Sequence, residues 1–217
     1  MRHLAKVILK MAILFILIFA IAKATGFLSI EQVKSWLIAA KALSPAYMGS
    51  LVIVLLITDL FITVPTMTVI ALSGYFLGFQ NGMITSSIGL LSAGIIGYAI
   101  SRIFGHRFLG LLLKDPTAQA EAKASFLAHG SMIIILSRAV PMLPEMSAYL
   151  AGMTKMPFGK FIIAWFLNAL PYSLLIAYAG SISSMDDPKP AFYTAIGISS
   201  TLWLGWYLFN TKRKTGF

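Results

Sequence analysis

The sequence predicts an all-α integral membrane protein with about four transmembrane helices, two opposed re-entrant helical hairpins and both termini in the cytoplasm. Composition is the first observation: 59% of the 217 residues are hydrophobic and 11% are charged, whereas soluble domains carry roughly 25% charged residues. Long uncharged runs are the second, since Leu60–Ser101 holds no charged residue and exceeds the roughly 20 residues that span a bilayer as a helix. The third is a pair of apolar segments interrupted by prolines and ionisable side chains, which predict a polar site at membrane depth.

The N-terminal unit, residues 1–45, is predicted to hold a first transmembrane helix and an interfacial helix. Val7–Ala24 is an apolar run whose end lysines, Lys10 and Lys23, can reach the membrane surface. Lys23 and the lack of a clear small-residue cleavage site favour a retained helix over a signal peptide. Apolar residues then recur at helical spacing and predict an amphipathic helix in the interface: Ile30, Val33, Leu37 and Ala40.

The core unit, residues 46–180, begins with an apolar segment whose length fits neither one nor two membrane crossings. A straight helix over Ala46–Gly78 would be roughly 50 Å long at 1.5 Å per residue, which is too long for one crossing and short for two. Asp59 and a proline interrupt it. We therefore expect a re-entrant hairpin near residues 46–80. Its backbone positions are predicted to be Pro65, Gly74 and Gly78.

The rest of the core is predicted to contain a clean span, a surface connector, a second hairpin and another span. The span Gly82–Ile103 carries a small residue every four positions, which lets another helix approach closely: Gly89, Ala93, Gly97 and Ser101. His106–Gly130 is polar and is predicted to be a surface helical connector. The second broken segment gives a hairpin near 130–154, and Phe158–Gly180 gives the next span. The C-terminal unit, residues 181–217, is predicted to add a last helix over Ala191–Phe209 and a basic tail.

The distribution of positive charge supports this topology. With the N-terminus in the cytoplasm and each hairpin entering and leaving on one side, most lysines and arginines fall on the inner side, as membrane proteins prefer. Treating either hairpin as a single crossing would place a basic cluster outside. We expect a multi-pass protein of the cell (plasma or inner) membrane. The basic residues left on the outer side are Lys23, Lys34, Lys41 and Lys189.

Three ionisable residues lie deep in the apolar segments and are the candidate site: Asp59, Arg138 and Glu145. The fork of an arginine suits the oxygens of an anionic phosphate group, and the two acids would supply counter-charge or protons. The alternative is a structural ion pair that ties the two hairpins together. The prolines that break the helices, Pro65, Pro141 and Pro144, would leave half-helix ends whose dipoles face an anion; the alternative is a kink without a ligand.

Other kinds of chemistry find no support in the sequence. The chain has no cysteine and its three histidines, His3, His106 and His129, are scattered, so no metal site is expected. Ser137 lies in no nucleophile elbow, and we expect neither an enzyme nor a cofactor. The net charge of +10 arises in short segments that flank apolar runs, which is typical of membrane topology rather than of nucleic-acid binding.

Several motifs resemble a known family. From Arg138 to Phe161 an arginine precedes two prolines, a glycine follows at Gly152, and the pair Pro157-Phe158 opens the next helix. This pattern resembles the signature of the DedA / SNARE-associated Golgi protein (VTT domain) superfamily, most closely its vacuolar-targeting-like branch. The stretches Ala71–Gly78, Gly97–Gly105 and Leu170–Gly180 are similar to other parts of the family, so that the likeness covers about residues 46–180.

The resemblance implies two opposed re-entrant hairpins that enclose a site, and the movement of lipids across the bilayer. By position Arg138 matches the arginine of the family and Asp59 matches an acid of the first hairpin. Many bacterial members carry a second acid where this chain has Thr66-Met67-Thr68, and a second arginine near the place of Pro144-Glu145. The predicted substrate-binding residues are Arg138, Pro141, Pro144 and Gly152.

The sequence thus favours a flippase-like or scramblase-like transporter of an anionic lipid, such as a polyprenyl phosphate or a phospholipid, with proton coupling left open. Its partners would be membrane lipids with an anionic head group, and a homo-oligomer is compatible with the sequence. A proton-coupled exporter of a small ion or solute is the alternative, because it too needs a charged site at the midplane. A membrane scaffold that uses the small-residue face from Gly89 to Ser101 is the third interpretation, and it leaves the buried charges unexplained.

Overall fold

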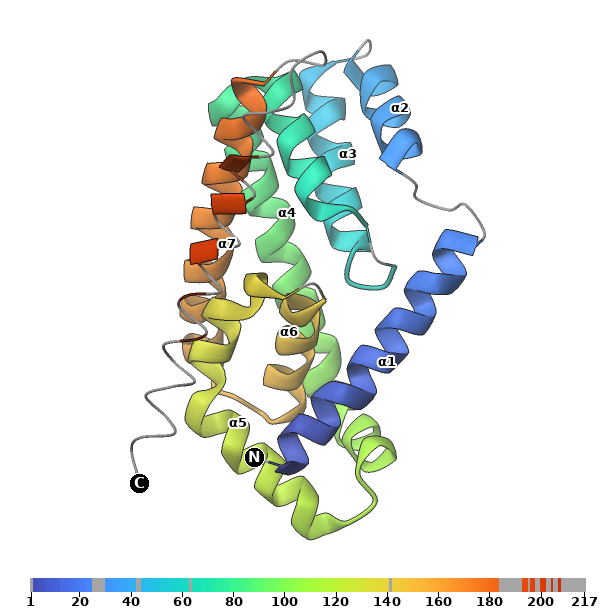
Figure 1. Ribbon diagram of the computed structural model, residues 1–217, viewed down its shortest axis with the longest axis vertical. Coiled ribbons are helices and arrows are strands. Elements are labelled where there is room, and N and C mark those ends of the chain that lie inside the picture. The colour runs from blue at the N-terminus through green and yellow to red at the C-terminus, as the bar shows by residue number, and fades with distance from the viewer. Residues whose placement is uncertain are drawn as a thin grey trace.

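The computed structural model describes residues 2–24, 30–41, 44–62, 64–140 and 142–183, together with individual residues between 193 and 207. Over these residues the chain is helical and contains no strand, which confirms the predicted all-α class. Two described stretches are long and apolar enough to cross a membrane, Thr66–Gly105 and Phe158–Ser181. Figure 1 shows the helices packed into an elongated bundle in which α4 and α7 run along the long axis.

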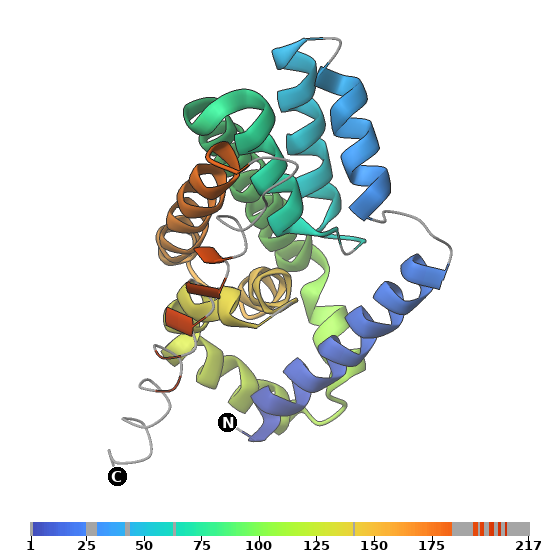
Figure 2. The same cartoon turned by 45° about the horizontal axis from the view of Figure 1, so that its top comes forward.

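The first two helices lie on the outside of this bundle. Helix α1 (Arg2–Ala24) crosses beside α5 (Figure 2), where His3 Nε2 lies 3.5 Å from Glu121 Oε2. Helix α2 (Ile30–Lys41) packs on α3 and α4. Its apolar face is buried at Val33 and Leu37, as the helical spacing of apolar residues predicts.

Helix α3 (Pro45–Thr58) and the first part of α4 (Thr66–Leu112) form the first hairpin, residues 45–77. Ser44 caps the start of α3 by accepting a hydrogen bond of 3.2 Å from the Tyr47 N–H, and a proline occupies the first turn, where its missing N–H costs nothing. The chain then turns at Asp59–Pro65 near the middle of the long axis and runs back beside α3 (Figure 1).

Helix α4 is broken where the first hairpin ends. Gly78 has φ +78° and ψ 167°, a backbone conformation that glycine alone adopts readily. Beyond it the chain reverses so closely that a Cβ at Gly82 would lie 2.7 Å from the Gly74 backbone. Gly78 therefore allows a tight return, after which α4 continues to Leu112. The predicted span Gly82–Ile103 is thus part of a longer helix.

The second hairpin, residues 116–153, comes from the opposite end of the molecule. It comprises α5 (Pro116–Leu136), the short 3₁₀ helix η1 (Ser137–Ala139) and α6 (Leu143–Met153). The surface helical connector predicted over His106–Gly130 is helical and has an exposed side, as at Glu121, but it is not separate from the second hairpin, because α5 runs without a break from Pro116 into it. Its apolar side is buried, as at Phe126. Asp115 caps this helix, and hydrogen bonds from the Thr117 hydroxyl and N–H hold the pKa of the Asp115 carboxyl below its usual value.

Small residues of α4 allow the first hairpin to approach closely, and α7 (Phe158–Ser181) also packs beside α4. A Cβ at Gly89 would lie 2.8 Å from Leu56 of α3, and one at Gly97 would lie 2.7 Å from Leu60. The predicted close approach along this face is confirmed, and the chain's own helices occupy the face. The scaffold interpretation therefore loses the surface on which it depends. The predicted last helix, Ala191–Phe209, lies largely outside the described residues, as does the basic tail.

Candidate functional site

The turns of the two hairpins bring the three predicted ionisable residues together. Asp59 comes from the turn after α3, Arg138 from η1 and Glu145 from the first turn of α6. All three line one small internal cavity of about 10 Å³, which is close to the volume that one water molecule needs. Trp165 of α7 closes one wall and donates a hydrogen bond of 2.9 Å to the Leu90 carbonyl of α4.

Asp59 holds the turn of the first hairpin in place. Its side chain is only 7% exposed. Its Oδ1 accepts a hydrogen bond of 2.7 Å from the Val64 N–H, and its Oδ2 accepts one of 2.5 Å from the Thr66 hydroxyl. Because these donors lie at the start of α4, the carboxylate also faces the positive end of that helix. Asp59 thus stabilises the turn, in addition to its predicted role as a source of counter-charge or protons.

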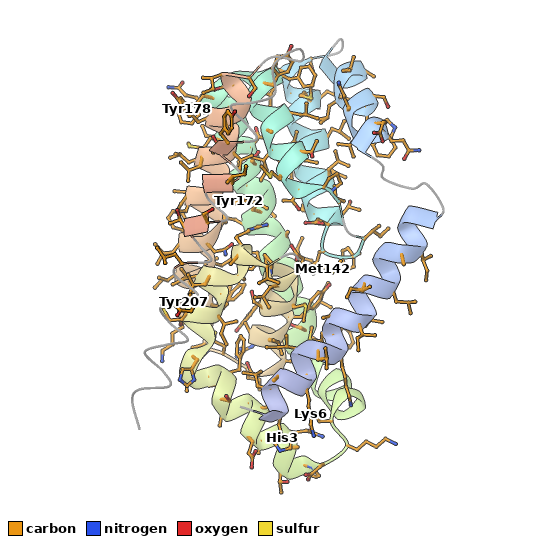
Figure 3. All side chains as sticks on the ribbon, in the orientation of Figure 1. His3, Lys6, Met142, Tyr172, Tyr178 and Tyr207 are labelled. Carbon is orange, nitrogen blue, oxygen red and sulfur yellow. The ribbon has the colours of Figure 1, made fainter. Side chains whose placement is uncertain are left out.

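Glu145 lies at the start of α6, which begins after a backbone reversal. Met142 has φ +65° at the position before the helix, and Figure 3 labels it near the middle of the molecule. Pro144 is buried in the first turn, where a missing N–H is tolerated. No side chain among the described residues donates a hydrogen bond to the Glu145 carboxylate, which faces the small cavity beside Asp59 and Arg138.

Arg138 is held by two residues of α7. Its Nε donates a hydrogen bond of 3.2 Å to Asn168 Oδ1, and its central carbon lies 4.7 Å from the centre of the Tyr172 ring, within the range of a cation–π contact. The guanidinium group shares the small cavity with Asp59 and Glu145 and interacts electrostatically with both acids. A structural ion pair between the hairpins therefore stays an alternative to the binding of an anion.

Asn168 is a site residue that the sequence interpretation missed. Its Nδ2 donates to the Ile134 carbonyl at 2.8 Å, to the Ile135 carbonyl at 3.2 Å and to Ser137 Oγ at 3.0 Å. It thereby satisfies carbonyls left free where α5 ends, while its Oδ1 orients Arg138. A single asparagine in the uncharged run Phe161–Met185 was the available signal, since a polar amide inside a membrane needs partners.

Replacing Asn168 by alanine is expected to lower the free energy of unfolding by about 1–3 kcal/mol, because buried carbonyls lose their donor. Thermal unfolding of the purified protein in detergent measures the effect. Ser181→Ala is the matched control on the same helix, since it removes a hydroxyl that donates only to the nearby Tyr178 carbonyl. Equal unfolding midpoints for the two variants would show that Asn168 does not support the turn.

Other predicted residues lie away from the small cavity. Gly74 is packed against the Ala177 backbone of α7, and Gly152 is packed against Ser101 of α4. Pro65 precedes the first turn of α4. Pro141 lies outside the described residues. Gly152 therefore belongs to a helix crossing, while its predicted contact with a substrate stays a prediction.

A second, larger cavity begins at the same arginine. Its volume is about 430 Å³, and its walls include Arg138, Asn168 and Tyr172. Figure 3 labels Tyr172 beside α7. Arg138 thus lies between the small cavity with the two acids and the larger cavity beside α7.

Fold and site together define a helical membrane protein in which the turns of two opposed hairpins enclose an arginine and two acids. The VTT domain matches residues 64–182, more than half of the chain, and the chain belongs to the VTT domain (DedA) family. The resemblance seen in the sequence is thereby confirmed for the superfamily; the vacuolar-targeting-like branch stays a prediction.

Curated relatives extend this finding. The chain is 29% identical to undecaprenyl phosphate transporter A of Bacillus subtilis over 169 residues, which cover 71% of this chain and 85% of that protein. It is 31% identical to protein DedA of Escherichia coli K12 over 99 residues, 42% of this chain and 45% of that protein. No solved structure matches the chain.

Proposed function

We propose that this protein moves an anionic lipid, such as a polyprenyl phosphate or a phospholipid, between the leaflets of the cell membrane. The observation that carries the proposal is Arg138, which lies between the hairpin turns and whose terminal nitrogens donate no hydrogen bond to another described residue. A guanidinium group at membrane depth is costly unless it faces an anion or water, and its planar fork matches the oxygens of a phosphate. The relative named as an undecaprenyl phosphate transporter supports an anionic lipid as the substrate.

In this proposal Arg138 binds the phosphate, and Asp59 and Glu145 supply counter-charge or protons when the site is empty. The starts of α4 and α6 lie at the two turns and direct their positive ends toward the middle of the molecule. We further propose that the hairpins are re-entrant, that four helices span the bilayer, and that both termini are cytoplasmic, as the distribution of lysine and arginine favours. No covalent bond is made or broken.

A proton-coupled exporter of a small ion or solute remains the second candidate. It is favoured by Glu145, whose carboxylate receives no hydrogen bond from a described side chain and lies beside Asp59 and Arg138. Such an exporter would move its solute in vesicles without accelerating lipid exchange, so the two candidates give opposite results in one preparation.

Reconstitution in liposomes tests the proposed function. Vesicles carry a fluorescent phosphate lipid in both leaflets, and a reductant that cannot cross the bilayer bleaches the outer one. We expect the protein to make the inner pool accessible much faster than in empty vesicles, and an imposed pH gradient to reveal any proton coupling. Exchange no faster than in empty vesicles, with and without the gradient, would refute lipid transport.

A further inference from the structure

The larger cavity beside α7 is a groove with one polar end. Its volume of about 430 Å³ falls within the roughly 300–1,000 Å³ of small-molecule sites. Arg138 and Asn168 form the polar end. The remaining lining residues come from α5, α7 and the C-terminal segment: Ile135, Leu167, Pro171, Tyr172, Leu175, Thr194, Gly197 and Thr201.

The groove reaches the outer surface of the bundle. Leu167 is 52% exposed and Leu175 is 41% exposed, although both are large apolar side chains that line the cavity. In a membrane such a surface faces lipid chains and not water. A molecule bound at Arg138 could therefore leave an apolar chain along α7 without drawing that chain through polar surroundings.

The chemistry of the two ends specifies the occupant. An apolar wall gives a lipid chain no net gain over the bilayer, because the bilayer is equally apolar. Binding must therefore come from the polar end, where the terminal nitrogens of Arg138 donate no hydrogen bond to another described residue, while Asn168 and the Tyr172 ring orient the guanidinium group. Charge-assisted bonds to an oxyanion are the strongest that such a group can form.

We propose that this groove binds one lipid with a phosphate head group, the phosphate lying at Arg138 and the first part of the chain lying along α7, beside Thr194, Gly197 and Thr201. This inference rests on the proposed function and deepens it by naming the side of the bundle at which the lipid enters. The small cavity with Asp59 and Glu145 then lies on the inner side of Arg138, beyond the groove.

Two glycines allow a matched test. A Cβ added at Gly197, in the groove wall, meets nothing within 4 Å, and the same holds for Gly159 in the first turn of α7. Gly159 does not line the groove. Gly197→Phe should therefore fill the groove without disturbing the packing, and Gly159→Phe adds the same ring elsewhere on the surface.

The experiment uses the full chain in liposomes with phosphatidic acid that carries a photoactivatable group near the start of one chain. After illumination, mass spectrometry locates the labelled peptides. We expect label around Leu167–Leu175, a several-fold loss of it in Gly197→Phe, and no loss in Gly159→Phe. Diacylglycerol with the same photoactivatable chain should label this region several-fold less, and added inorganic phosphate should compete poorly.

Three results would contradict the binding of a phosphate lipid in the groove. They are equal labelling by diacylglycerol, equal labelling in the two phenylalanine variants, and full displacement by inorganic phosphate. The last of these would indicate a site for the free ion. Leaflet exchange measured in the same liposomes separates the two proposals. Exchange without groove labelling retains the proposed function and refutes the groove. Groove labelling without exchange retains the binding site and refutes transport.

Discussion

Arg138→Lys is expected to reduce lipid exchange in liposomes roughly 10- to 100-fold, although the positive charge is kept. Lysine loses the planar fork, and the loss of one charge-assisted hydrogen bond worth about 1.5–3 kcal/mol corresponds to a change in rate of that size. It also loses the Nε–H that donates to Asn168 Oδ1. The measurement is the initial rate of leaflet exchange at equal protein content.

Arg102→Lys is the matched control for this prediction. Arg102 donates hydrogen bonds to the Tyr98 hydroxyl at 2.5 Å and to the Met156 carbonyl at 3.1 Å, and it lines neither cavity. We expect exchange by this variant to stay near the wild-type rate. Full activity of Arg138→Lys would place phosphate recognition elsewhere in the protein.

Gly180→Val is expected to destabilise the protein by about 3 kcal/mol or more, at the upper end of overpacking effects. A Cβ at Gly180 would overlap the carbonyl group of Ala71, and one at Gly74 would overlap the carbonyl group of Ala177. The first hairpin and α7 thus cross with their backbones in contact. Backbone atoms cannot rotate away as a flexible side chain can, so the helices must move apart.

Thermal unfolding in detergent and the yield of monodisperse protein measure this effect. Gly159→Val is the control, because a Cβ there meets nothing within 4 Å. Its only expected effect is the small difference in helix propensity between glycine and valine. If the Gly180→Val protein unfolds at the same temperature as the control, the backbones of the first hairpin and α7 are not in close contact at this crossing.

Local sequence patterns were sufficient to predict where the two hairpins are interrupted. The breaks at Asp59–Pro65 and after Arg138 are visible in the sequence, because a proline or a charge within an apolar run is exceptional at membrane depth. The continuous helix from Pro116 to Leu136 was not anticipated. Its polar first half resembles a surface connector, while the burial of Phe126 depends on packing that hydropathy does not report.

The sequence by itself determined the helical membrane class, the two broken segments and the candidate residues Asp59, Arg138 and Glu145, because hydropathy, charge and helix breaking are properties of neighbouring residues. Only the tertiary structure decided what these residues contact. Arg138 donates a hydrogen bond to Asn168, thirty positions away, and shares a cavity with Asp59 and Glu145. Asp59 accepts its hydrogen bonds from residues of its own turn. Hydrogen bonds and cavities form between helices that are distant in the chain, and the helix crossings that place them depend on the whole packing.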